Sequence, residues 1–216
     1  MFLNLLSMIF FGFFLQLQYT FKMAYEIEKK AWLSSLSDME KKVASFMSFI
    51  KEDMKKDTYY IHSSSAHIDF MKDSIFRIRE DNSGVFINYK QREFSGKTEI
   101  NQETEFPVIN PGELEKLFFY MGYKILVKKY KHSKIYGYKN AAVELNVIED
   151  LGNFIEVEVI AENEGEKDAA ISTINEIFSL LEIPEKDIEN RYYIDLLLAK
   201  THTQKVLPGD KKTNSH

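Results

Sequence analysis

Residues 151–159, LGNFIEVEV, contain the pattern that decides the fold. The glycine and asparagine at the start of this stretch are typical of a tight turn. From residue 155 onward apolar and acidic residues alternate, and successive side chains of a strand point to opposite faces. One face carries Ile155, Val157 and Val159, and the other carries Glu156 and Glu158. The segment therefore predicts a turn followed by a strand with one apolar and one charged face.

Similar alternation recurs in other segments that are rich in Ile, Val, Tyr and Phe. We expect strands at about 24–32, 57–62, 74–80, 85–93, 97–106, 123–131, 134–148 and 153–160. Short turn-like connections such as residues 95–96 favour antiparallel hairpins over crossover units. The charged faces carry, as acids and amides, Glu26, Glu28, Glu99, Asn101, Glu103, Glu105, Glu144, Asn146, Glu156 and Glu158, and, as bases, Lys30, Arg77, Arg79, Lys90, Arg92, Lys129 and Lys131.

Three further segments have the spacing of amphipathic helices. The first covers residues 37–54 and opens with a capping box of serine and glutamate. The second covers residues 111–121, after an Asn-Pro pair and before a glycine. The third covers residues 170–181 and ends before a proline. We interpret all three as helices that cover a sheet.

Paired carboxylates and paired cations dominate the polar faces of the predicted strands. If the sheet closes with these faces inward and the helices cover its apolar face, the result is a barrel with a polar lumen. Burying so many charges without a partner is prohibitive. A polyphosphate with divalent cations resolves the cost, because carboxylates suit Mg²⁺ or Mn²⁺ while Arg and Lys bind phosphate oxygens. The alternative is a lattice of salt bridges on the surface.

The composition excludes several classes of protein. The chain has 216 residues, of which 44% are hydrophobic, and a formal net charge of −5, which favours one globular domain over a disordered chain. The absence of cysteine excludes disulfide frameworks, thiolate zinc sites and cysteine nucleophiles. Lysines are frequent in residues 124–139, but in an acidic chain we interpret them as a phosphate-binding strand and expect no nucleic acid partner. We expect the protein to be cytoplasmic.

The two ends of the sequence differ from the rest. Residues 1–22 form a hydrophobic leader with three alternative interpretations: a secretory signal, a membrane anchor, or a start codon assigned too early, since Met23 directly precedes the first strand. The leader lacks the basic start and the small residues of a secretory signal, and membrane contact is expected only if it is translated. Residues 199–216 are polar, and we expect a disordered tail.

An ordered series of motifs resembles the CYTH superfamily. The motifs are Glu26-Ile27-Glu28-Lys29-Lys30, an E-x-E-x-K signature, then Phe76-Arg77-Ile78-Arg79, Lys90, Glu103-Thr104-Glu105-Phe106, Gly122-Tyr123 with Lys129 and Lys131, Leu151 to Glu158, and Ile188 to Tyr193. The resemblance covers about residues 24–198, so that residues 23–198 form the predicted domain. It is greatest to the CyaB-type class IV adenylyl cyclases, whose relatives include thiamine triphosphatases. Two positions depart from the pattern: Asn146 replaces an aspartate, and an arginine before Glu103 has no equivalent.

The resemblance implies a mainly β, α+β fold: a closed eight-stranded antiparallel barrel, forming a triphosphate tunnel, covered by amphipathic helices. It also implies a homodimer. The implied metal ligands for Mg²⁺ or Mn²⁺ are Glu26, Glu28, Glu103, Glu105, Asn146, Glu156 and Glu158, the implied phosphate-binding residues are Lys30, Arg77, Arg79, Lys90, Arg92, Lys129 and Lys131, and the implied catalytic residues are Glu26, Glu28 and Lys30.

Three functions fit these residues. The first is an adenylyl cyclase that converts ATP to cyclic AMP and pyrophosphate. The second is metal-dependent hydrolysis of another triphosphate, such as thiamine triphosphate or inorganic tripolyphosphate. The third is a non-catalytic module that binds polyphosphate. The sequence discriminates poorly among them because all three use the same metal and phosphate ligands.

Overall fold

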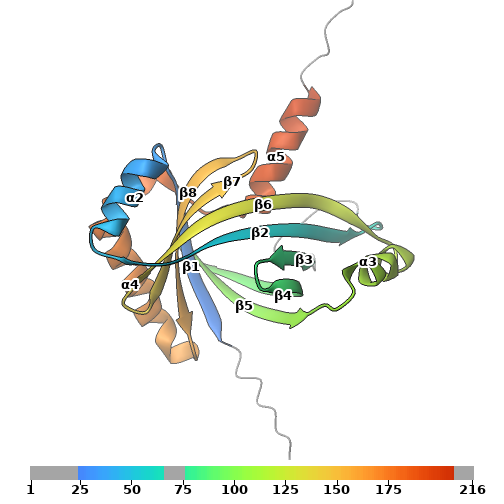
Figure 1. The fold of residues 1–216 in the computed structure, drawn as a ribbon, viewed down its shortest axis with the longest axis horizontal. Helices are drawn as coiled ribbons and strands as arrows, with labels where there is room; N and C mark the ends of the chain where they lie inside the picture. The colour runs from blue at the N-terminus through green and yellow to red at the C-terminus, as the bar shows by residue number, and fades with distance from the viewer. Residues whose placement is uncertain (1–23, 66–75, 207–216) are drawn as a thin grey trace, which may run out of the picture.

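The structure is a computed structural model that describes residues 24–65 and 76–206 (Figure 1). Its strands are β1 (Tyr25–Trp32), β2 (Ser48–His62), β3 (Phe76–Asp81), β4 (Gly84–Ser95), β5 (Thr98–Pro107), β6 (Tyr123–Tyr138), β7 (Ala141–Ile148), β8 (Gly152–Ala161) and β9 (Ile188–Glu189). Its α-helices are α2 (Leu36–Ala44), α3 (Pro111–Tyr120), α4 (Lys167–Leu180) and α5 (Tyr193–Val206).

The sheet closes on itself. Neighbouring strands follow the order β5-β4-β3-β2-β6-β7-β8-β1, and β1 also pairs with β5, from Tyr25 opposite Gln102 to Glu28 opposite Glu99. Every pairing is antiparallel, and β9 adds a short ninth strand beside β1. The predicted closed eight-stranded antiparallel barrel with covering helices is therefore confirmed.

The largest apolar core lies outside the barrel wall, beneath α2 and α4. Strand side chains such as Ile27, Val143 and Val157 are fully buried there, together with Ile174 and Ile177 of α4. Figure 1 shows α2 and α4 at the same end of the barrel. Because the apolar faces of these strands point outward to the helices, their charged faces must point into the lumen. The arrangement of faces expected from the sequence is therefore present.

A second apolar cluster lies under α3, at the opposite end of the barrel from α2 and α4 (Figure 1). The side chain of Asn110 caps α3 by accepting a hydrogen bond from the backbone N–H of Glu113, and a proline begins the helix, as the sequence predicts. The buried ring of Phe118 packs edge-on against Tyr60, which fixes the helix on the wall of the barrel. The expectations for α3 and α4 are both confirmed.

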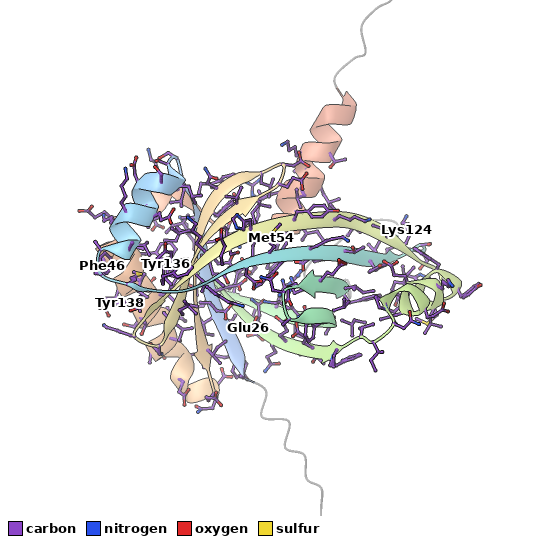
Figure 2. The ribbon with its side chains drawn as sticks, viewed as in Figure 1. Glu26, Phe46, Met54, Lys124, Tyr136 and Tyr138 are labelled. Atoms are coloured by element: carbon purple, nitrogen blue, oxygen red, sulfur yellow. The ribbon has the colours of Figure 1, made fainter. Side chains whose placement is uncertain are left out.

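The expected helix at 37–54 is wrong over its second half. The helix starts one residue earlier than predicted, at Leu36, is capped by Ser35, and ends at Ala44, after which β2 begins at Ser48. The connection packs against β6, where the rings of Phe46 and Tyr138 meet edge to face (Figure 2). From Ser48 onward β2 pairs with β6 along its whole length. Pairing with this long neighbour outweighs the local helical spacing.

The predicted boundary between the strands at 123–131 and 134–148 is also wrong. β6 continues without interruption to Tyr138, and the hairpin turn lies at Lys139 and Asn140. Lys139 has a φ of 53°, the left-handed conformation that such tight turns require. The sequence did not predict this turn because residues 139–140 contain neither glycine nor proline.

The C-terminal expectation is only partly met. Residues 199–206, which we expected to belong to a disordered tail, continue α5. The leader at 1–22 and the rest of the predicted tail, residues 207–216, lie outside the described residues. Among residues 24–65 and 76–206, the helices are too short and too polar to cross a membrane.

Candidate functional site

The barrel encloses a cavity of about 320 Å³ whose wall is almost entirely charged. Of the predicted site residues, the cavity is lined by Glu26, Glu28, Lys30, Arg77, Arg79, Lys90, Arg92, Glu103, Glu105, Lys129, Lys131, Glu156 and Glu158. Asn146 is the one predicted site residue that is not part of the lining. Figure 2 labels Glu26 on β1, the strand that begins at the lower edge of the barrel in this view. Strand alternation therefore identified most of the lumen.

Three carboxylates form a compact group on β1 and β8. Glu28 lies directly opposite Glu158 in the strand register, and Glu26, two residues before Glu28, lies on the same face of β1. One carboxylate oxygen from each of the three lies within 4.8 Å of the others. Like charges at this separation repel each other strongly unless a proton or a cation lies between them.

The burial and close approach of these three carboxylates change their pKa values. Burial raises the pKa of Glu158 to about 8, and the charges of Glu26 and Glu28 add to the increase. Burial likewise raises the pKa of Glu26 to about 7. Burial also opposes ionisation of Glu28, but Lys90 and Lys30 lower its pKa to about 2. Without a metal ion, the group therefore retains protons near neutral pH.

Lys90 is the main counter-ion of these carboxylates. Its Nζ lies 2.5 Å from Glu26, 3.0 Å from Glu103 and 3.9 Å from Glu28. Burial alone would lower the pKa of this ammonium, but the surrounding carboxylates, Glu28 first among them, raise it. Lys90 therefore stays charged and brings Glu103 next to the group of three.

The donor set fits a divalent cation. Carboxylate oxygens are the ligands that Mg²⁺ and Mn²⁺ prefer, and two of the three carboxylates hold protons that a cation would displace. Of the other predicted ligands, Glu103 lies beside the group through Lys90. The exposed Glu105 instead accepts a hydrogen bond from Asn88, and Glu156 accepts one from the Tyr193 hydroxyl at 2.8 Å. The structure thus favours Glu26, Glu28 and Glu158 as the metal group.

Asn146 occupies a different environment from the one predicted. Its side chain is fully buried, its oxygen accepts a hydrogen bond from Ser133 at 2.6 Å, and its amide donates to Glu156 at 3.3 Å. Both ends of the amide are therefore engaged within the wall. We leave Asn146 out of the metal group for this reason.

The lumen also holds a separate group of three cations. Arg77, Arg79 and Lys129 surround Asp57, a fully buried carboxylate of β2 that the sequence pattern did not identify as a site residue. Asp57 lies opposite Arg79 on β3 and opposite Lys129 on β6. The three cations carry more charge than one carboxylate neutralises, so the group is suited to bind an anion.

Several other lumen residues escaped the sequence analysis. Lys51 and Asp53 line the cavity from the part of β2 that we predicted to be helical, and Lys55 lines it from the residue directly after that part. Their spacing of two was a usable signal once that segment is recognised as a strand. Glu99 and Glu144 were recognised as members of charged strand faces but not as partners of the basic residues. Glu99 forms a buried ion pair with Lys30, and Glu144 lies 2.5 Å from Lys131.

Aromatic side chains from the start of α5 line part of the cavity. The Tyr192 ring lies 4.3 Å from the guanidinium carbon of Arg92, within the range of a cation–π contact. Lys30 lies between Tyr192 and Tyr193, 5.7 and 5.5 Å from their ring centroids. Both tyrosines belong to the last of the motifs found in the sequence.

The raised pKa values make a prediction for the stability of the metal-free protein. Glu26 and Glu158 bind protons in the folded state up to about pH 7 and 8, whereas in the unfolded chain they lose them near the ordinary value of 4.5. The free energy of unfolding should therefore fall as the pH rises from about 5 to 8.5 in EDTA. Thermal denaturation would measure this, and Glu158→Gln should flatten the dependence. A wild-type melting temperature that rises across this range would contradict the assignment.

Comparisons with known proteins agree with this architecture. The CYTH domain family matches residues 24–193 of the chain. A putative adenylate cyclase of Methanocaldococcus jannaschii is 26% identical over 149 residues, which cover 68% of this chain and 83% of the relative.

Solved structures resemble the barrel as a whole. One protein of Pyrococcus horikoshii is 28% identical, with a TM-score of 0.67 and coverage of 79% of this chain and 98% of that one. A second protein of the same organism is 26% identical, with a TM-score of 0.66 and coverage of 81% and 99%. A Hippeastrum protein, described as a putative adenylyl cyclase with a dominant triphosphatase activity, is 15% identical, with a TM-score of 0.59 and coverage of 83% and 96%, and shares the fold.

Proposed function

The chain belongs to the CYTH family, and on this premise we propose that it is a class IV adenylyl cyclase that converts ATP to cyclic AMP and pyrophosphate. One observation carries the proposal: a single cavity inside the barrel holds a group of three carboxylates and, separately, a group of three cations. Such a cavity suits a multiply anionic ligand that enters with divalent cations. The name of the M. jannaschii relative favours cyclisation as the reaction.

In this proposal the basic residues bind and orient the triphosphate. Arg77, Arg79 and Lys129 form the strongest anion-binding group, because their combined charge exceeds that of Asp57. Lys131 and Lys55 extend the positive charge along the wall. Holding the phosphates in this way places the α-phosphorus within reach of the ribose 3′-oxygen and stabilises the charge that develops on the departing pyrophosphate.

Glu26, Glu28 and Glu158 would hold the metal ion. A bound Mg²⁺ or Mn²⁺ supplies Lewis-acid chemistry, lowering the pKa of the 3′-hydroxyl and neutralising charge on the phosphates. Lys90 is placed to keep the three carboxylates together when no metal ion is bound, since its ammonium contacts two of them and Glu103. Lys30 would bind the triphosphate from a position beside Tyr192 and Tyr193. Its ion pair with Glu99 holds it in the wall of the barrel.

Hydrolysis of a triphosphate is the second candidate. The Hippeastrum neighbour that shares the fold is described as having a dominant triphosphatase activity. The same carboxylates and cations serve both reactions, and the outcome depends on which phosphorus lies beside the attacking oxygen. In the hydrolytic case, water attacks the terminal phosphorus of thiamine triphosphate or tripolyphosphate.

A paired substrate assay tests the proposal. A protein that starts at Met23 would receive ATP, thiamine triphosphate or tripolyphosphate in separate reactions, each with Mg²⁺ or Mn²⁺. We expect cyclic AMP and pyrophosphate in equal amounts from ATP, since cyclisation releases one of each. Phosphate release without cyclic AMP would instead support hydrolysis. Binding of tripolyphosphate without any turnover would identify a non-catalytic module.

A further inference from the structure

Among the residues that the structure describes, Asp57 is the one carboxylate that contacts all three cations of the anion-binding group. Its Oδ1 accepts a hydrogen bond from Arg79 Nε at 2.8 Å, and its Oδ2 accepts one from Arg79 Nη2 at 3.2 Å. The same Oδ2 lies 2.9 Å from Lys129 Nζ and 3.4 Å from Arg77 Nη1. The guanidinium of Arg79 is thus held at two points, which fixes the plane of the group as well as its position.

Asp57 lies behind the cations and not on the surface of the cavity. Arg77, Arg79 and Lys129 line the cavity, but Asp57 does not and has no exposed surface. A ligand in the lumen would therefore touch the cations and not the carboxylate. Among the described residues, Arg77 Nε is buried without a hydrogen-bond partner, so this group retains an unused donor.

We propose that Asp57 is a positioning residue for the triphosphate: it locks Arg77, Arg79 and Lys129 into one rigid anion-binding group. This inference rests on the proposed function and deepens it. The strand register supports the role, because Asp57 stands opposite Arg79 on one side and opposite Lys129 on the other. From this central position its carboxylate contacts both neighbours at hydrogen-bonding distance.

A positioning residue acts on rate more than on affinity. Asp57→Asn removes the charge that holds the cations together but also removes a negative charge behind the anion site, which favours anion binding. Asp57→Glu keeps the charge and pushes the cations toward the cavity by one methylene. We expect turnover of ATP to fall about a hundredfold in Asp57→Asn and at least about tenfold in Asp57→Glu, because misplacement by about 1 Å has effects of this size.

The test measures rate and affinity separately. Turnover is followed as cyclic AMP and phosphate formed from ATP, and affinity as the dissociation constant of tripolyphosphate, by calorimetry in EDTA. We expect that constant to be no higher in either variant than in the wild-type protein. Glu80→Gln is the matched control, since Glu80 pairs with Lys56 across the same two strands but is exposed outside the lumen. Its rate and affinity should both be unchanged.

Two results would overturn the inference. One is a wild-type rate in Asp57→Glu, which would reduce the role of Asp57 to charge neutralisation. The other is a loss of tripolyphosphate affinity by the same factor as the loss of rate. If Asp57→Asn does not fold, Asp57→Glu decides the question because it keeps the counter-ion. Failure of the wild-type protein to bind tripolyphosphate when Mg²⁺ or Mn²⁺ is present in place of EDTA would instead contradict the proposed function itself.

Discussion

Replacing Glu158 with glutamine should greatly reduce turnover and at the same time stabilise the metal-free protein at pH 8. The substitution removes one of the three carboxylates whose oxygens lie within 4.8 Å of each other. A metal ion contributes several kcal/mol to the stabilisation of a transition state, and about 1.4 kcal/mol corresponds to a tenfold change in rate. We therefore expect turnover to fall about a thousandfold.

The gain in stability follows from the same crowding. Burial, together with the charges of Glu26 and Glu28, raises the pKa of Glu158 to about 8, so that ionising it is unfavourable in the folded state. Glutamine resembles the protonated form and avoids this cost above pH 7. Activity and stability should thus change in opposite directions, which distinguishes a metal-binding residue from one that only supports the fold.

The measurements are a rate assay with Mg²⁺ or Mn²⁺ and thermal denaturation in EDTA. Glu176→Gln serves as the control, since this exposed residue of α4 pairs with Lys139 outside the lumen. Near-normal turnover in Glu158→Gln would contradict the assignment of the metal group. So would a melting temperature at pH 8 below that of the wild-type protein.

Strand alternation predicted the lumen well because it depends on local geometry alone. Glu26 and Glu28 two residues apart, and Arg77 and Arg79 likewise, must share a face in any extended strand. Closing the sheet then brings such faces together, whatever the order of the strands. For this reason the barrel, and the position of all but one of the predicted site residues in the lumen, could be predicted from the sequence.

The start of β2 shows where local pattern is ambiguous. Phe46, Ile50 and Met54 are spaced by four, and residues four apart share a face in a helix and also in a strand. The pairing of β2 with β6 decides between the two, and it is a long-range contact that the segment itself does not encode. The misassigned helix in turn concealed the alternation of Lys51 and Asp53 in the same stretch.

Counter-ion pairing is the part of the site that the sequence could not supply. Glu99 pairs with Lys30 from a strand 69 positions away, and Asp57 is held between residues of β3 and β6. Both contacts depend on strand order and register. The sequence predicted which residues are charged and inward, whereas the structure shows which of them neutralise one another.

The largest effect on stability is expected from Lys90→Met. Lys90 is the ammonium that Glu26 and Glu103 both contact within 3.0 Å, and its side chain is only 13% exposed. Without it, Glu26, Glu28, Glu103 and Glu158 remain in the lumen with their nearest counter-ion gone. Removing one partner of a buried ion pair costs about 3–5 kcal/mol, because the remaining charges are left uncompensated.

In a protein of this size, 1 kcal/mol shifts the melting temperature by about 2–4 °C, so Lys90→Met should lower it by about 6–20 °C in EDTA at pH 8. Mn²⁺ should restore much of the loss, because a divalent cation can replace the missing ammonium among the carboxylates. Lys139→Met is the matched control, as it removes an exposed ion pair outside the lumen and should shift the melting temperature by less than about 2 °C. An Mn²⁺ effect no larger in Lys90→Met than in Lys139→Met would show that the carboxylates do not form a metal site, since a site that has lost its competing ammonium must gain the most from the cation.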